Sequence, residues 1–236
     1  MSAIFKRELR AYFTSPLGYF VLAIVFVFSG VFFYLNNMYA GSANLSGVFS
    51  GLFIVTLLIV LPVLTMRLFS DDKRQRTDQA LLTAPVSLTG IALGKFLAAL
   101  LVFAIGISIT LVYAVVIAFQ VVPDWLVIFG NYLGLLLLGG LIISIGLLIS
   151  SFTESQFVSA IATFAVSFAL LMVDELTSVF SANTVVVEII NFISVFQRYT
   201  NFTVGSINYA DVIFFLSMQA LFVFLTVRSL DRKRWG

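Results

Sequence analysis

The sequence contains no cysteine and no histidine among its 236 residues. Without cysteine the chain forms no disulfide bond and no thiolate metal site. Without histidine it lacks the commonest general base, the commonest protein metal ligand and every catalytic triad built on an imidazole. These absences exclude most hydrolase and metalloenzyme sites, so we expect no catalytic residue and no metal site on this chain.

Charged residues are scarce, at 10% of the chain, whereas 61% of the residues are hydrophobic. A soluble domain carries about 25% charged residues, which cover its surface. This sequence instead contains apolar runs of about 20 residues, each long enough to cross a bilayer as a helix. Six such runs occur, at 17–35, 48–68, 93–119, 126–149, 157–173 and 212–227. Since no alternating strand pattern occurs, the sequence predicts an all-α integral membrane protein with six transmembrane helices in one domain, 1–236.

The distribution of Lys and Arg predicts the orientation of these helices. Every basic residue except Arg198 lies at the amino end, in or beside the loop after the second span, or at the carboxyl end. These three regions are on one side of a six-span protein, and short loops rich in Lys and Arg face the cytoplasm. We therefore expect a multi-pass protein with its N- and C-termini in the cytoplasm.

Residues 2–13 predict an amphipathic helix ahead of the first span. Its basic face carries Lys6, Arg7 and Arg10, and the opposite face is apolar. Such a helix lies in the membrane interface with its basic side toward anionic headgroups. The alternative interpretation is a frayed cationic tail.

The loop 70–87, SDDKRQRTDQALLTAPVS, contains both charged and apolar residues. We expect Ser70 to cap a short helix, with Asp71 and Asp72 at its positive end, and Ser87 to start the next helix. A solvated charged loop without a helix is the alternative. Just beyond it, we expect Lys95 to extend its ammonium group from a helix end into water.

The stretch 174–211 between the fifth and sixth spans is predicted to lie outside the cell. Within it, residues 185–196 are apolar apart from one polar stripe, and twelve residues are too few to span a bilayer. We expect a re-entrant or surface-lying helix there.

A search for catalytic or nucleotide-binding motifs returns little. The segment GIALGK, 90–95, has one residue too few between its glycines for a phosphate-binding loop, and Phe96 stands where that loop needs Ser or Thr. We therefore expect no nucleotide cofactor and no nucleic acid on this chain. No ionisable residue occurs mid-span, which argues against a proton-driven carrier.

Four stretches of local sequence carry a family resemblance. They are FKRELRAY followed by FTSPLGYF at 5–20, TDQALLTAPVSLTGIALGKFL at 77–97, ISSFTESQFVSA at 149–160, and INYADVIFFLSMQALFVFLTVRSLDRKRW at 207–235. Together with the six spans they resemble an ABC-2-type ABC transporter permease of the gliding-motility-type subfamily. One departure is that a Gly-Thr pair is usual where this sequence has Arg76 and Thr77.

The resemblance implies the ABC-2-type exporter fold and a non-enzymatic role in a bacterial cytoplasmic (inner) membrane. ATP and Mg would be bound by a separate ABC ATP-binding subunit. Other implied partners are the lipid bilayer, a second permease chain (as a homo- or heterodimer) and an auxiliary subunit with an extracytoplasmic domain. The loop would be a coupling helix, and the residues expected to contact the ATP-binding subunit are Asp72, Arg74, Arg76, Thr77, Asp78, Leu81, Leu82, Thr83 and Glu154.

Two other functions stay open from the sequence. One is an ATP-independent secondary carrier, against which the lack of mid-span charge and of inverted repeats argues. The other is a non-transporting scaffold subunit of a larger membrane apparatus, which the resemblance to gliding-motility components keeps open.

Overall fold

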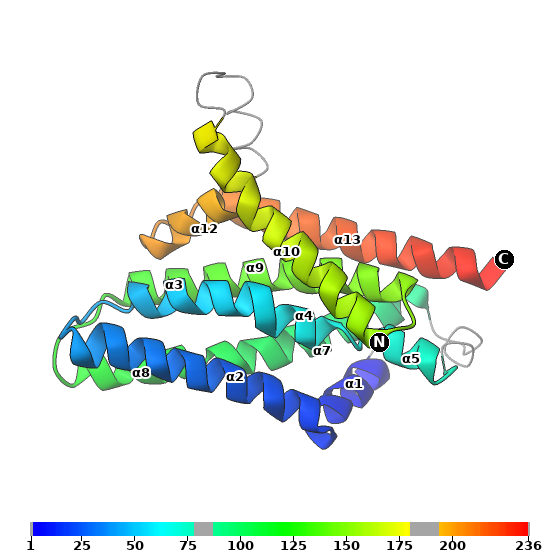
Figure 1. The fold of residues 1–236 in the computed structure, drawn as a ribbon, viewed down its shortest axis with the longest axis horizontal. Coiled ribbons are helices and arrows are strands. Elements are labelled where there is room, and N and C mark those ends of the chain that lie inside the picture. The colour runs from blue at the N-terminus through cyan, green and yellow to red at the C-terminus, as the bar shows by residue number, and fades with distance from the viewer. Residues whose placement is uncertain (1, 78–86, 180–193, 236) are drawn as a thin grey trace.

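The computed structural model describes residues 2–77, 87–179 and 194–235, and within these it contains helices and no strands (Figure 1). Six helical segments of the described chain are long and apolar enough to cross a membrane, which confirms the predicted fold class. They are Pro16–Tyr39, Ser46–Arg74, Leu88–Ala118, Trp125–Phe152, Gln156–Val173 and Tyr209–Arg232.

Several spans are composed of more than one helix. The first contains α2 (Pro16–Phe33) and the π-helix η1 (Tyr34–Tyr39), and the third contains α7 (Leu88–Ile107) and α8 (Ile109–Ala118). The second contains α3 (Ser46–Val55), the π-helix η2 (Thr56–Val60), α4 (Leu61–Thr65) and α5 (Ser70–Arg74). Pro62 has no N–H to donate and its ring crowds the preceding turn, so the widened turn of η2 lies where the α-helix cannot continue regularly.

The fourth span, α9 (Trp125–Phe152), forms the centre of the bundle, and most of its residues are buried. Its glycines allow close approach by different neighbours. A Cβ atom at Gly130 would lie 2.7 Å from the nearest atom of Phe202, and one at Gly139 would lie 2.2 Å from Phe103. At Gly140 the nearest atom would be 2.7 Å away on Gln219, and at Gly146 it would be 2.4 Å away on Thr65. These glycines therefore let four elements pack directly on α9, because small residues allow close helix contact in membrane bundles.

The amino-terminal helix α1 (Ser2–Thr14) is amphipathic, close to the predicted range. Lys6, Arg7 and Arg10 are exposed, whereas Ile4 and Tyr12 are buried. The apolar face packs on protein, mainly α7 and α2, and Ile4 lies directly over Gly94. α1 is thus attached to the bundle through contacts that the sequence pattern alone does not reveal.

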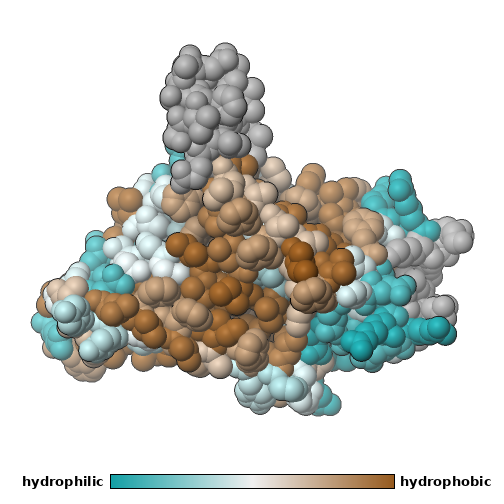
Figure 2. Space-filling view, viewed as in Figure 1, coloured by the Kyte–Doolittle hydropathy of each residue, from teal (hydrophilic) through white to brown (hydrophobic). Residues whose placement is uncertain are grey.

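Both termini lie toward the end of the bundle that carries α1 and α5 (Figure 1). We call this the basic end, defined by its exposed or half-exposed cations, Lys6, Arg7, Arg10, Lys73, Arg74, Arg76, Arg228 and Arg232. Figure 2 shows hydrophilic residues gathered at this end and a broad hydrophobic band across the middle of the molecule. Exposed apolar side chains of this kind are expected where helices face lipid.

The remaining helices within the described residues are α10 (Gln156–Val179), α12 (Val195–Thr203) and α13 (Tyr209–Trp235). The predicted external helix over 185–196 lies mostly outside the described residues, and α12 begins where that range ends. Arg198 on α12 pairs with Asp211 at 2.8 Å, and Asn201 donates to the other carboxylate oxygen of Asp211 at 2.8 Å. Arg198, the basic residue predicted to lie outside the cell, is therefore paired with a buried carboxylate at the start of the sixth span.

The close approach at Gly130 gives a test of this packing. We expect Gly130→Ala to destabilise the protein by about 1–3 kcal/mol, because its Cβ would meet the backbone carbonyl oxygen of Phe202 at 2.7 Å. The measurement is the thermal unfolding midpoint in detergent. Gly30→Ala is the matched control, since its Cβ would meet only Tyr113 at 3.6 Å and alanine favours a helix by about 0.5–1 kcal/mol. Equal unfolding midpoints for the two variants would contradict the close packing of Gly130 against Phe202.

Candidate functional site

The short helix α5 forms the end of the second span and carries a charge at four of its five positions. Asp71 and Asp72 occupy its first turn, and Lys73 and Arg74 its last, so that both pairs complement the helix dipole. The predicted capping by Ser70 is wrong: Phe69 is the N-cap residue, and the Ser70 hydroxyl donates to the carbonyl oxygen of Met66 one turn earlier.

The carboxyl end of α5 is closed by a Schellman motif. The N–H of Thr77 donates to the carbonyl of Asp72 at 2.8 Å, and the N–H of Arg76 donates to that of Lys73 at 3.0 Å. Arg76 has the left-handed backbone that the motif requires, with φ of 55°. The Thr77 hydroxyl also donates to the backbone and side-chain oxygens of Asp72, both at 3.2 Å. Arg76 thus occupies a position that favours glycine, which has no Cβ to crowd the turn.

A buried lysine lies beneath α5. The Lys95 side chain is only 2% exposed, and its Nζ lies 2.7 Å from Asp72 Oδ2 and 3.0 Å from Glu8 Oε1. The expectation that Lys95 reaches water is therefore wrong. α7 begins at Leu88, five residues before the predicted start of the span, which places Lys95 about two turns inside the helix and beneath α1 and α5.

This cluster of Glu8, Asp72 and Lys95 joins three segments that are far apart in sequence, α1, α5 and α7. A buried ammonium group is costly unless it is paired, and two carboxylates pair with it here. Arg7 lies 2.6 Å from Glu8 and 3.8 Å from Asp72, so a second cation balances the two anions. Partial burial acts to lower the pKa of Arg7, but the hydrogen bond to Glu8 and the charges of Glu8 and Asp72 outweigh it and raise that pKa.

A second set of contacts fixes α1 against the end of the second span. The hydroxyl of Tyr12 donates to the carbonyl oxygen of Leu64 at 2.9 Å, and Arg67 donates to the Ser15 hydroxyl at 2.7 Å. The Arg67 guanidinium also lies over the Tyr12 ring, 5.3 Å from its centroid. Burial raises the pKa of Tyr12, so its hydroxyl remains a neutral donor. α1 is therefore anchored at both of its ends.

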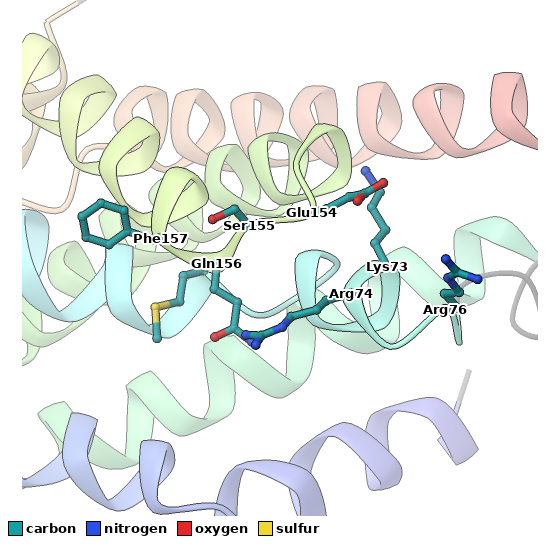
Figure 3. A pocket seen from close by; sticks show the side chains of 8 residues that line it. Lys73, Arg74, Arg76, Glu154, Ser155, Gln156 and Phe157 are labelled. Atoms are coloured by element: carbon teal, nitrogen blue, oxygen red, sulfur yellow. The ribbon is translucent and has the colours of Figure 1, made fainter.

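On its other side α5 meets the turn between α9 and α10. Gln156 donates to Asp71 at 3.0 Å, and Lys73 donates to the carbonyl oxygen of Ser151. A pocket of about 930 Å³ lies between these segments, and Figure 3 shows side chains of both around it. We call it the basic-end pocket; it is lined by Met66, Lys73, Arg74, Arg76, Glu154, Ser155, Gln156 and Phe157.

The structure brings only part of the predicted contact set together. Arg74, Arg76 and Glu154 line the basic-end pocket, whereas Asp72 pairs with Lys95 and Thr77 bonds to Asp72. The other predicted contact residues, Asp78, Leu81, Leu82 and Thr83, lie outside the described residues.

Sequence reasoning missed Glu8 and Gln156, and it misplaced Lys95. A signal for Glu8 was present: Ile4, Glu8 and Tyr12 follow one another at four-residue spacing, which places a carboxylate on the apolar face of α1. A carboxylate there needs a buried cation, and Lys95 is the one cation of the third apolar run. No comparable signal marks Gln156. Among the described residues, no group of three or more Asp, Glu, His or Cys side chains is placed to hold a metal ion.

The fold and this cluster define a multi-pass, all-helical membrane protein with a charged, structured end. Residues 13–173 match the family model described as ABC-2 family transporter protein. The match runs from the end of α1 through the fifth span, more than half of the chain, so the protein belongs to the ABC-2 family as a transporter membrane component. No curated protein matches the sequence.

The Lys95 cluster yields a stability prediction. We expect Lys95→Met to cost about 3–5 kcal/mol, because it removes the buried cation that two partly buried carboxylates share and leaves them only the outer cation Arg7. Replacing all three members with Lys95→Met, Glu8→Gln and Asp72→Asn removes the charges together and should recover much of that loss. The measurement compares the thermal unfolding midpoint of the triple variant with that of Lys95→Met. A lower midpoint for the triple variant would argue against pairing of Lys95 with the two carboxylates.

The Schellman motif yields a second prediction. Arg76→Gly should stabilise the end of α5 by about 1 kcal/mol, because glycine adopts the left-handed backbone without crowding. Amide hydrogen exchange at Arg76 and Thr77 measures the effect. Gln75→Gly is the control, since Gln75 has an ordinary helical φ of −87° and should show faster exchange, not slower.

Proposed function

We propose that this chain is the membrane subunit of an ATP-driven exporter, and that a separate ATP-binding subunit docks over the basic-end pocket. The observation that carries the proposal is the basic-end pocket, formed where α5 meets the α9–α10 turn. Its lining offers three cations and the Glu154 carboxylate at the surface of the molecule. A charged concave surface of this kind suits a protein partner with complementary charges.

The bonds of α5 support a role in transmitting movement. A partner that displaces α5 also displaces α1 and α7, because Asp72 is paired with Lys95 and, through it, linked to Glu8. Gln156 and Lys73 link the same helix to the fourth and fifth spans. Rigid elements joined in this way shift whole helices rather than bending locally. In this proposal α5 and the loop through Asp78, Leu81, Leu82 and Thr83 form the coupling segment.

The remaining parts of the proposal concern orientation and partners. The basic end faces the cytoplasm, as the distribution of Lys and Arg predicts. The membrane is the inner membrane of a bacterium, as the family resemblance implies. ATP and Mg bind to the partner, a second permease chain completes the transporter, and an auxiliary subunit with an extracytoplasmic domain joins a gliding-motility-type complex. The exposed face of α1, with Lys6, Arg7 and Arg10, contacts anionic headgroups.

The test is association with an ATP-binding subunit encoded in a neighbouring reading frame. Arg74→Ala, Asp78→Ala and Leu82→Ala together should lower its recovery in co-purification about tenfold, equivalent to about 1.4 kcal/mol of binding free energy. Arg232→Ala is the matched control, because Arg232 is an exposed arginine at the same end, outside the basic-end pocket. Unchanged recovery of the partner would contradict the docking site.

A second measurement separates export from scaffolding. Replacing the catalytic Glu of the partner's ATPase site should abolish function if ATP hydrolysis drives transport. Function that survives this replacement would contradict the exporter assignment and favour a scaffold.

A further inference from the structure

A second pocket, of about 700 Å³, lies between α9 and α13 at the basic end. The two helices pack along one another toward the C-terminus (Figure 1). We call it the α9–α13 pocket; it is lined by Leu148, Phe152, Leu225, Arg228, Ser229, Asp231 and Arg232. None of these residues lines the basic-end pocket, so the proposed docking of an ATP-binding subunit leaves this pocket unexplained.

The pocket lies where the apolar surface of two spans meets the charged end of the molecule. All of its described lining residues belong to the fourth and sixth candidate membrane spans, close to the ends of those spans. Phe152 is 64% exposed and Leu225 is 41% exposed, so the apolar part of the lining is open to lipid. Figure 2 shows the hydrophobic band giving way to hydrophilic residues toward this end. A pocket at such a boundary lies at the level of the lipid headgroups.

One face of α13 changes from apolar to basic as it passes the pocket. Leu221, Leu225, Arg228 and Arg232 follow one another at spacings of four, three and four residues, which places them on one side of the helix. Leu221 is 50% exposed, and the side chain of Arg228 is 66% exposed. A molecule that lies along this face therefore reaches both the leucines and the guanidinium groups.

The arginines of the pocket carry positive charge that their described neighbours do not fully neutralise. Asp231 is the one acidic residue of the described lining, and its Oδ2 lies 3.9 Å from Nη1 of Arg228, longer than a hydrogen bond. Among the described residues, Arg232 forms no ion pair. Because guanidinium groups donate in pairs to phosphate oxygens, this excess of positive charge suits a phosphate group.

We propose that the α9–α13 pocket binds the headgroup of an anionic phospholipid. Arg228 and Arg232 donate to its phosphate oxygens, and one acyl chain lies against Leu225 and the exposed face of α13. The excess positive charge favours a lipid with a net negative charge over a zwitterionic one. This binding site goes beyond the proposed coupling to ATP, since it requires neither the partner nor nucleotide.

The experiment labels the purified full chain in detergent with a phosphatidylglycerol that carries a photoreactive diazirine in one acyl chain. Crosslinked peptides are mapped by mass spectrometry over a range of probe concentrations, and we expect saturable labelling where α9 and α13 border the pocket. Arg228→Gln and Arg232→Gln together should raise the half-saturating concentration about tenfold, because the charge-assisted bonds to phosphate are lost. Arg10→Gln is the matched control, since Arg10 is an exposed arginine of the basic end that lies on α1, and it should leave the value unchanged.

A second pair of variants tests the apolar part of the pocket. Leu225→Trp should lower labelling about tenfold, because the indole ring occupies the space of the acyl chain. Leu221→Trp is its control, since Leu221 lies one turn earlier on the same exposed face and outside the lining. Both positions are exposed, so the protein should tolerate the two changes, which equal thermal unfolding midpoints would verify.

Several results would overturn the proposal. An unchanged half-saturation for the double arginine variant, or equal binding of a matched phosphatidylcholine probe, would remove the anionic headgroup. Equal weakening by Arg10→Gln would indicate general attraction to the basic end and no site. Displacement of the probe by an equal concentration of inorganic phosphate would assign the pocket to a soluble anion. The chain has no cysteine, so disulfide-linked dimers of Leu225→Cys would assign the pocket to a second copy instead.

Discussion

The buried ammonium group of Lys95 determines how the basic end is organised. A cation two turns inside an apolar helix needs carboxylates nearby, and they come from Glu8 on α1 and Asp72 on α5. Satisfying this one charge therefore places an amino-terminal helix and an inter-span helix on the same side of the third span. Such pairing contributes little net stability compared with an apolar core. Loss of one partner is costly, however, so the ion pairs favour this arrangement of the three helices over others.

The bundle itself depends on a different constraint, which is close approach between helices. Lipid offers no hydrophobic drive for helix association, so contact must come from packing of small residues. α9 meets this need with glycines toward α12, α7, α13 and α4, and with the Gln219 side chain donating to the Leu137 carbonyl at 2.8 Å. The basic-end pocket lies at one end of this frame, between α5 and the turn that follows α9.

The basic-end pocket is bordered by three cations and a carboxylate, which suits a protein surface. In the proposed exporter, this end receives the ATP-binding subunit. The central helix α9 contacts both α5 and α12, so it is the element through which the two ends are mechanically connected.

The sequence by itself determined the class and the number of spans, because the length and apolarity of each segment are local properties that lipid selects directly. It also located the start of α7 at Ser87, whose side chain accepts from the N–H of Gly90 at 3.2 Å, since capping acts over three residues. It did not place Lys95, whose burial depends on α1 and α5 covering it. It did not find the hydrogen bond from Gln156 to Asp71 either. Those features arise from contacts between segments separated by tens of residues, and only the tertiary structure decided which side chains meet.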